Sequence, residues 1–422
     1  MTNKGLSTDS YKGVRDFYPE DMAIQQYIFD VWSKTAESFG FERYDASILE
    51  PSELYKAKGA ENEEMVHEQT YTFIDRGNRE VTLRPEMTPT VARMVAGRRR
   101  ELSYPVRWYS IPNLFRYERP QKGRLREHCQ LNCDVFGADH FSVDVEIIAL
   151  AYHIFLNFGA DSKMFEIRIN NRIEMAELYK QVGVHDEETQ TKITRLNDKF
   201  RKITKDEYKN QLRKIVDDKK IVEDIYHILA VEETDSHNPV LQGLQELGIK
   251  NVKIDRSLAR GFDYYTGTIF EFFDISGENR RSMLGGGRYD NLTALFGGEP
   301  IIGIGFGFGD VTMRDFLETH DLLTSNITAP TLMILPTDEA HNLEAQKIAQ
   351  IFRDADISVT VDCSTKKVGK KISDASEAFV SYVLVLGENE LKAKTYVVKN
   401  LEGKTEVSGT LAELIAHIEA TE

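Results

Sequence analysis

Residues 115–137 read FRYERPQKGRLREHCQLNCDVFG, and this stretch shows the local pattern of the first part of the chain most clearly. Two runs with apolar residues flank a polar segment that contains Pro120 and Gly123, which favour turns. The pattern predicts a strand, a basic turn and a second strand. Guanidinium groups bind phosphate oxygens through paired contacts, so the functional interpretation is a phosphate clamp. A solvent-exposed basic hairpin is the structural alternative.

The second strand of this hairpin is expected to carry two polar residues on one face. Side chains alternate between the faces of a strand, so Gln130 and Asp134, four residues apart, share a face. Arg116 lies across the hairpin, and we expect it to face the same cavity as Gln130.

The chain has three cysteines, Cys129, Cys133 and Cys363, which do not form the spacing of a disulfide framework. A reducing cytoplasm is the simple interpretation. Cys129 and Cys133, with His128 beside them, raise a metal site as an alternative. Zinc sites usually pair cysteines as C-x2-C with a second pair elsewhere, so two ordinary strand positions are favoured.

Outside the hairpin, short apolar runs separated by turn residues predict further strands of a mostly antiparallel sheet. Apolar residues at helical spacing predict helices packed against it. The expected strands are 71–74, 81–84, 106–111, 113–117, 130–137, 252–255, 268–273 and 301–308, and the expected helices are 21–39 and 141–158.

The composition changes from residue 172 to about residue 250, where Lys, Glu, Asp, Gln and Leu dominate at helical spacing. We predict an inserted helical subdomain at 172–250, whose charges are typical of a solvated face. It would divide an α+β catalytic core at 1–171 and 251–323.

Polar residues at 323–330 lead to Pro330 and predict a linker. Strands at 331–335, 358–361, 382–386 and 395–399 then alternate with helices at 339–354 and 368–378, and a final helix follows. This order predicts a small α/β domain at 330–422 with a mainly parallel sheet.

Size and charge narrow the function classes. The 422 residues, 41% hydrophobic, suffice for about two to three domains of roughly 150 residues each. The net charge of −15 argues against a general nucleic-acid coat, yet it leaves room for a specific RNA enzyme with a local basic patch. No apolar run approaches the roughly 18 residues of a membrane span, and residues 1–11 lack signal-peptide features. A cytoplasmic protein is expected.

Two further clusters contain residues suited to chemistry. In Thr82-Leu83-Arg84-Pro85-Glu86-Met87-Thr88, Glu86 and Thr88 follow a strand-ending proline. They form either a site or the first turn of a helix, where an acid is favoured. The second cluster is LARGFDYYTG at residues 258–267, followed by GGGRYD at 285–290. Glycines let a backbone approach a ligand closely, but the pattern is not G-x-G-x-x-G, which excludes a dinucleotide site.

These motifs together resemble histidyl-tRNA synthetases, a family of class II aminoacyl-tRNA synthetases, over essentially the whole chain. Gly13-Val14-Arg15-Asp16 with Pro19 resembles the N-terminal signature of the family, and Leu49-Glu50-Pro51 resembles the first class II signature, which lies at the dimer interface. Residues 115–123 resemble the second signature. Residues 260–267, RGFDYYTG, resemble a signature peculiar to the histidine enzymes, which separates them from the prolyl, threonyl and glycyl relatives.

The resemblance implies the class II fold, a C-terminal anticodon-binding domain, a homodimer, and the substrates L-histidine, ATP with Mg²⁺, and tRNA(His). It also implies a role for each matching residue. Glu86, Thr88 and Gln130 hold the α-amino group of histidine; Asp134 and Tyr265 contact the imidazole nitrogens, with Tyr264 beside them; Arg116 binds the α-phosphate and Arg260 lies on the other side of the reacting centre; Glu118 and His128 belong to the ATP site; Arg119 and Gln121 meet the acceptor end of the tRNA.

The chain departs from the family at two positions. The third class II signature usually closes with Gly-Leu-Glu-Arg, and Val311 stands where that arginine is expected, so Arg314 is a candidate replacement. His128 stands where the family commonly has a phenylalanine against adenine, and an imidazole can also stack.

Two other functions remain as alternatives. A synthetase-like regulatory subunit of ATP phosphoribosyltransferase binds histidine as a sensor, but such subunits generally lack the appended α/β domain. A binding-only paralogue, such as a kinase-associated tRNA sensor, normally carries further domains. The basic residues Lys366, Lys367, Lys370 and Lys371 fit an anticodon contact and a solvated helix start equally well.

Overall fold

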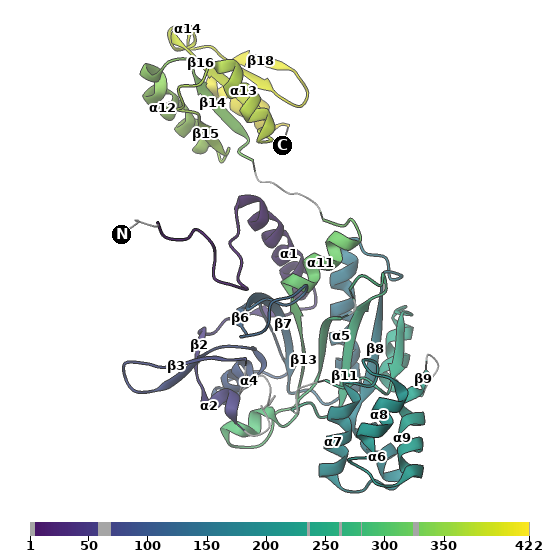
Figure 1. Cartoon of the computed structure of the whole chain (residues 1–422). Coiled ribbons are helices and arrows are strands. Elements are labelled where there is room, and N and C mark those ends of the chain that lie inside the picture. Colours follow the sequence, from purple (N-terminus) through teal and green to yellow (C-terminus); the bar gives the residue numbers. More distant parts are fainter. Residues whose placement is uncertain are drawn as a thin grey trace. The chain divides into compact units, whose positions relative to one another are not determined.

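The computed structural model describes residues 5–57, 69–233, 237–260, 264–279, 281–323 and 329–421. The chain divides into two compact units, Met1–Thr324 and Ser325–Glu422, which are described separately (Figure 1). The predicted linker falls mostly on residues 324–328, which lie outside the described residues.

The first unit is built on a ten-stranded, mostly antiparallel sheet. Only the β1–β5 and β8–β10 pairs are parallel among the pairs of this sheet in the described residues. The predicted antiparallel sheet is therefore confirmed. Its order is β1 (Glu42–Arg43), β5 (Val106–Ser110), β7 (Glu127–Phe136), β13 (Gly303–Gly309), β12 (Ser282–Arg288), β11 (Thr268–Asp274), β8 (Phe165–Asn171), β10 (Val252–Asp255) and β9 (Glu232–Glu233), and β6 (Asn113–Phe115) pairs with β7.

One face of this sheet is buried under helices in the main hydrophobic core. Trp32 of α1, Phe155 of α5 and Phe316 of α11 are fully buried there, together with Leu244 of α10. The opposite face is not part of this core, and a cavity opens on it. The covering helices are α1 (Pro19–Ser38), α5 (Phe141–Asn157), α10 (Pro239–Glu246) and α11 (Asp310–Thr319).

A small antiparallel sheet and two helices lie beside the main sheet. The sheet has the order β2 (Leu49–Pro51), β4 (Glu80–Leu83) and β3 (Tyr71–Ile74). Helix α2 (Glu53–Lys56) follows β2, and α4 (Thr88–Gly97) follows β4. The short 3-10 helix η1 (Leu292–Phe296) connects β12 to β13.

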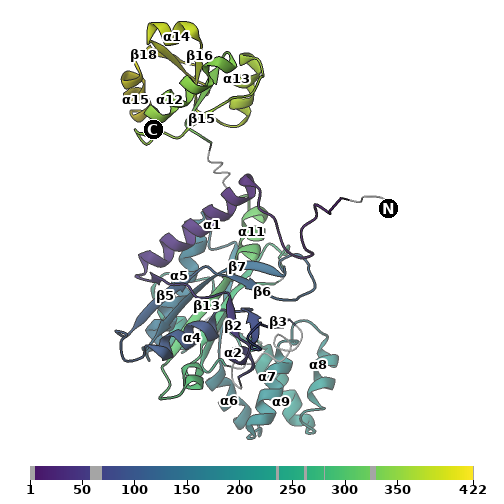
Figure 2. The same cartoon turned by 90° about the vertical axis from the view of Figure 1, so that its left-hand side faces the viewer.

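Four helices between β8 and β9 form a separate helical segment with its own core, in which Tyr179, Ile193, Tyr208 and Ile225 are buried. Figure 2 shows these helices gathered beside one end of the sheet. They are α6 (Arg172–Gln181), α7 (Glu187–Asn197), α8 (Lys205–Leu212) and α9 (Lys219–Ala230). Helix α10 instead packs into the core of the main sheet. The domain boundaries at 172 and 250 stay a prediction.

Four strands of the main sheet, β1, β8, β9 and β12, were not predicted from the sequence. The triple glycine of β12 was interpreted as backbone that a ligand can approach closely, and it gave no strand signal because glycine is depleted in strands. Here the glycines are required by close packing: a Cβ on Gly286 would lie 2.2 Å from the carbonyl oxygen of Gly305 on β13.

The second unit is a five-stranded sheet covered on both faces. Leu332, Ile334 and Leu384 face α12 and α15, and Leu335 and Val383 face α13. The predicted α/β domain is confirmed, but its sheet is mixed: two strand pairs are parallel and two are antiparallel. The order is β15 (Val359–Val361), β14 (Leu332–Pro336), β16 (Tyr382–Leu386), β17 (Tyr396–Asn400) and β18 (Glu406–Gly409), with η2 (Glu339–His341), α12 (Asn342–Arg353), α13 (Val368–Glu377), α14 (Glu388–Ala393) and α15 (Leu411–Glu419).

The mainly parallel sheet was a wrong expectation because the last strand, β18, was not recognised. It forms a hairpin with β17, and its residues alternate between more and less exposed positions. A short strand with one solvated face carries only a weak apolar signal.

Candidate active site

The open face of the main sheet is lined by glycines of β13. This strand reads GIGFGFG, and its apolar residues Ile304, Phe306 and Phe308 point into the core. A Cβ on Gly305 would lie 2.4 Å from Oδ1 of Asp134, and one on Gly307 would lie 2.8 Å from Cδ of Gln130. The alternating glycines therefore leave space for the two side chains that β7 presents on this face.

The neighbouring strand β12 accommodates two more of the predicted site residues. A Cβ on Gly285 would lie 1.3 Å from Nη1 of Arg260, so the guanidinium occupies the volume of the missing side chain. A Cβ on Gly287 would lie 2.9 Å from the ring of Tyr265. Any larger residue at these positions would displace the loop that carries Arg260 and Tyr265.

A cavity of about 230 Å³ opens on this face of the sheet. Arg116 and Arg260 lie on its wall with Arg124, so it presents three guanidinium groups and is suited to a polyanionic ligand. Five predicted site residues line it: Arg116, Glu118, His128, Gln130 and Arg260.

The two arginines predicted to contact the phosphates are held by neighbours. Arg116 donates from Nε to the carbonyl oxygen of Pro85 at 2.8 Å. Arg260 donates from Nη1 to Oε1 of Glu271 at 3.1 Å. Burial raises the pKa of Glu271, and the charge of Arg260 opposes that rise. Each guanidinium is thus oriented before a ligand arrives.

Glu86 is buried behind this cavity, with a residue exposure of 3%. Tyr264 donates its hydroxyl to Oε2 at 3.0 Å, whereas Oε1 has no hydrogen-bond partner among the described residues. Burial raises the pKa of Glu86 to about 7, although Arg116, Tyr264 and Arg260 oppose it. Thr88, the first residue of α4, interacts with the Tyr264 side chain. Glu86 is therefore an acceptor that a cationic donor would complete.

Asp134 on β7 is in the same condition. The hydroxyl of Tyr289 donates to Oδ1, while Oδ2 has no hydrogen-bond partner among the described residues. Burial raises the pKa of Asp134 to about 7. Tyr289 was quoted in the sequence motif GGGRYD but received no role. The signal that could have assigned it a role was its position directly after the glycine-rich segment, two residues beyond Gly287 and one beyond the end of β12.

The aromatic residues of the signature loop stand close to these acids. The rings of Tyr264 and Tyr265 are 4.9 Å apart, and those of Tyr264 and Tyr289 are 6.0 Å apart in an edge arrangement. Tyr264, Tyr265, Glu86 and Asp134 are buried rather than part of the cavity wall described above. Gly261, Phe262 and Asp263 of the same motif lie outside the described residues.

His128 holds a neutral ring in the cavity. Burial lowers its pKa to about 3, and the charges of Arg116 and Arg15 act in the same direction. A neutral imidazole can stack on an aromatic base. Cys133 points to the opposite face, into the main core. Among the described residues, no group of three His, Cys, Asp or Glu side chains is arranged to hold a metal ion.

The two residues predicted to meet the tRNA lie apart from the cavity. Arg119 and Gln121 are exposed on the turn between β6 and β7, and Gln121 forms an isolated bridge with Arg124. Other residues of this turn, Glu118, Gly123, Arg124 and Leu125, do line the cavity.

The position of the missing arginine of the third signature was assigned one residue too early. Counted from Gly309 in the order Gly-Leu-Glu-Arg, the arginine position falls on Thr312 rather than Val311. Both side chains line the cavity. Arg314 is not part of this wall: it contacts Asp21 at 3.0 Å and Glu318 at 2.8 Å, between α11 and α1. These contacts oppose the suggestion that Arg314 replaces the missing arginine.

Comparisons with known proteins agree with this arrangement. Residues 13–309 match the family model for histidyl-tRNA synthetase, and residues 331–421 match the anticodon binding domain. A protein of Leptospira biflexa named histidine–tRNA ligase is 40% identical, covering 99% of each chain, and one of Thermoplasma volcanium with the same name is 36% identical, covering 98% of this chain and 99% of its own. The crystal structure of histidyl-tRNA synthetase from Nostoc superposes with a TM-score of 0.80 at 22% identity, covering 99% of this chain and all of the other.

A catalytic synthetase domain followed by an anticodon-binding domain defines an aminoacyl-tRNA synthetase. The chain belongs to the histidyl-tRNA synthetase family, because the family model and the identity of the relatives both extend over most of its length. Among the described residues, no helix combines the length and the apolar character that crossing a bilayer requires.

Proposed function

We propose that this chain is a histidine–tRNA ligase that forms histidyl-adenylate and pyrophosphate from L-histidine and ATP, then transfers histidine to tRNA(His). One observation carries the proposal: the signature loop brings Arg260 into the cavity that contains Arg116, and it brings Tyr264 onto the buried Glu86. Family membership supports the same reaction.

Histidine would complete the two half-paired acids. Its α-ammonium group would donate to the free oxygen of Glu86, and Thr88 and Gln130 would hold the same group. An imidazole N–H is a donor for the free oxygen of Asp134, and Tyr265 would contact the second ring nitrogen. A site whose buried acceptors need these donors rejects analogues that lack them.

ATP would occupy the cavity with its phosphates between the guanidinium groups. The histidine carboxylate attacks the α-phosphorus, and the bond to pyrophosphate breaks. Arg116 and Arg260 would stabilise the negative charge that develops on the phosphoryl oxygens. Glu118 and the neutral ring of His128 would contact the adenine end. Mg²⁺ would enter with the triphosphate oxygens, which are its preferred ligands.

The tRNA would use two parts of the chain. The exposed turn with Arg119 and Gln121 would meet its acceptor end, and the unit at 331–421 would bind the anticodon. Within the basic run of that unit, Lys371 is buried against the carbonyl oxygens of Pro336 and Asp362. Lys366 and Lys370 pair with Asp374. Lys371 therefore has a structural role rather than a place on an RNA-binding surface.

We propose a homodimer that uses the small sheet of β2, β4 and β3. The first class II signature is strand β2 of this sheet. Ile48, Leu49, Phe73 and Ile74 are large apolar residues exposed on or beside it. Exposed apolar surface of this kind marks interaction sites, and these residues would contribute to the dimer contact. Sedimentation of the purified chain would test the dimer, and the substrates imply a cytoplasmic location.

The test is histidine-dependent ATP–pyrophosphate exchange by the purified chain, followed by charging of tRNA(His). Exchange that requires histidine is the expected result, and charging then completes the reaction. Histidine binding without exchange would contradict the proposal and favour a histidine-sensing regulatory subunit of ATP phosphoribosyltransferase instead.

A further inference from the structure

The loop that carries Arg260 is held at both ends by residues outside it. It begins after Asp255, the last residue of β10, and ends where β11 starts at Thr268. A guanidinium that stabilises charge on a phosphoryl oxygen must be placed accurately, because a displacement of about 1 Å can cost roughly 100-fold in rate. The contacts at the two ends of this loop therefore bear on catalysis.

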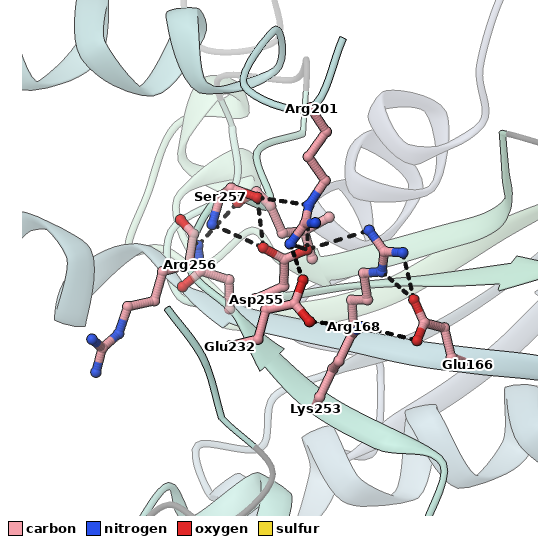
Figure 3. Close-up of polar contacts among 10 residues, drawn as sticks. Glu166, Arg168, Arg201, Glu232, Lys253, Asp255, Arg256 and Ser257 are labelled. Carbon is pink, nitrogen blue, oxygen red and sulfur yellow. Dashed lines mark hydrogen bonds and ion pairs between the residues drawn. The ribbon is translucent and has the colours of Figure 1, made fainter. Parts of the chain in front are cut away.

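The first end is fixed by a cluster of ion pairs around Asp255 (Figure 3). Asp255 is 1% exposed, and its Oδ1 accepts from the backbone and the hydroxyl of Ser257 at 3.0 and 2.6 Å. Its Oδ2 accepts from Arg201 at 3.1 Å and from Arg168 at 3.4 Å. Arg201 also donates to the Ser257 hydroxyl at 3.1 Å. The start of the loop is thus tied to Arg201.

The remaining members of the cluster balance its charge. Lys253 pairs with Glu166 and Glu232 at 3.0 Å each, and Arg201 also pairs with Glu232. Arg168 pairs with Glu166 in addition to Asp255. Three acids thus face three cations across β8, β10 and β9 (Figure 3). Arg201 alone among the six lies in the helical segment, between α7 and α8.

The second end is fixed by Arg172, the first residue of α6. Its Nη2 donates to the carbonyl oxygen of Arg260 at 3.0 Å, and its Nη1 donates to the carbonyl oxygen of Tyr265 at 3.0 Å. One guanidinium therefore spans the two sides of the loop. Its fork geometry suits two separate acceptors, which a lysine ammonium cannot reproduce.

We propose that the helical segment sets the position of Arg260 through Arg172 and Arg201. Both are positioning residues: each touches the loop backbone or Ser257, and neither lines the cavity. A shift of helices α6–α9 would move the loop at both ends and change the rate of adenylate formation. The inference deepens the proposed synthetase function, since it assigns a purpose to a helical segment that contributes no side chain to the described cavity wall.

The test compares Arg172→Met and Arg201→Met with Arg213→Met in the full chain. Arg213 belongs to the same helical segment and contacts Asn210 on the surface, so it is a matched control. Hydrogen–deuterium exchange of the loop amides at 256–260 and 264–267 is measured first, since it does not depend on activity. Faster exchange of these amides in both variants, and not in the control, is expected. Unchanged hydrogen exchange of the loop amides would overturn the proposed link between the helical segment and the loop, even if the chain proved inactive.

The kinetics of ATP–pyrophosphate exchange supply the second measurement. In an active wild-type chain, Arg172→Met should lower kcat for ATP–pyrophosphate exchange by about 10- to 100-fold while the KM for ATP changes little. Arg172→Lys, which reaches one carbonyl at a time, should recover only part of the rate and guards against misfolding of the Met variant. Wild-type kcat in both Arg172 variants would contradict the proposal. An inactive wild type would count against the proposed function alone.

Discussion

Four buried carboxylates of the catalytic unit fall into two groups that differ in how fully they are paired. Asp255 and Asp310 accept hydrogen bonds on both oxygens; those of Asp310 come from Arg15, Gln25 and the backbone of Cys129. Glu86 and Asp134 each have one tyrosine donor and one oxygen with no partner among the described residues.

The difference separates residues that hold the fold from residues that bind a ligand. A buried carboxylate is costly unless it is paired, so a fully paired one stabilises its neighbours, whereas a half-paired one lowers stability. The raised pKa of Glu86 and of Asp134 is the electrostatic sign of that cost. Protein sites commonly keep such perturbed groups because a substrate supplies the missing partner.

Arginines can be divided in the same way, into those that contact a ligand and those that hold the fold, and the largest effect is expected for a ligand-contacting arginine. Arg260→Ala should reduce histidine-dependent ATP–pyrophosphate exchange by about 1000-fold, because it removes a preorganised cation beside the reacting phosphate. Histidine binding, measured by calorimetry, should change little. Arg107→Ala is the matched control. Arg107 lies on β5, pairs with Glu146 of α5 at 2.6 Å, and does not line the cavity. Near-wild-type exchange in Arg260→Ala would remove the catalytic role.

Asp255→Asn should destabilise the catalytic unit by about 3 kcal/mol, because it leaves the cations of Arg168 and Arg201 without their shared partner. Denaturant unfolding followed by tryptophan fluorescence measures this, since both tryptophans, Trp32 and Trp108, lie in the first unit. Asp217→Asn, at an exposed position, is the control. A loss no larger than that of the control would place Asp255 outside the scaffold group.

Glu86→Gln and Asp134→Asn should act in the opposite direction on stability. For each acid the folded pKa, about 7, lies above the unfolded value near 4. Between these values the folded state binds more protons, so stability falls as pH rises from about 4 to about 7.

At pH 8 each amide should therefore raise the free energy of unfolding, by on the order of 2 kcal/mol, and below pH 4 the gain should vanish. Denaturant unfolding at the two pH values is the measurement, and exchange activity should fall in both variants. A loss of stability at pH 8 would show that these acids belong with Asp255 and Asp310.

The sequence predicted the main sheet and the residues at its open face better than it predicted their partners. Gln130 and Asp134 share a face because alternation in a strand is a local rule, and the glycines of β13 leave room for both. The pairing of Tyr289 with Asp134 joins residues 155 positions apart, and that of Tyr264 with Glu86 joins residues 178 apart. Such contacts depend on strand order, which local patterns do not contain.

Strand β12 is a second case in which contacts between strands could not be predicted from the local sequence. Its three glycines suggested backbone exposed to a ligand, and Gly285 does lie on the cavity wall. Gly286 and Gly287 are instead required by the carbonyl oxygens of Gly305 and Thr268 on adjacent strands. Arg314 was also misjudged, because its partner Asp21 comes from α1, at the other end of the unit's sequence.

The smallest expected effect concerns the exposed turn, which belongs to neither group of buried residues. Arg119 is exposed, so Arg119→Ala should leave stability and ATP–pyrophosphate exchange unchanged. At low salt, transfer of histidine to tRNA(His) should fall by about tenfold. The difference from wild type should narrow as salt is raised, because the variant makes one contact to an RNA phosphate fewer and therefore releases fewer counterions. Single-turnover transfer from preformed adenylate is the measurement, with Arg98→Ala, on another exposed surface, as the control. Equal transfer rates in the two variants would mean that the turn does not contact the acceptor end, and that this chain places its acceptor-binding cations elsewhere.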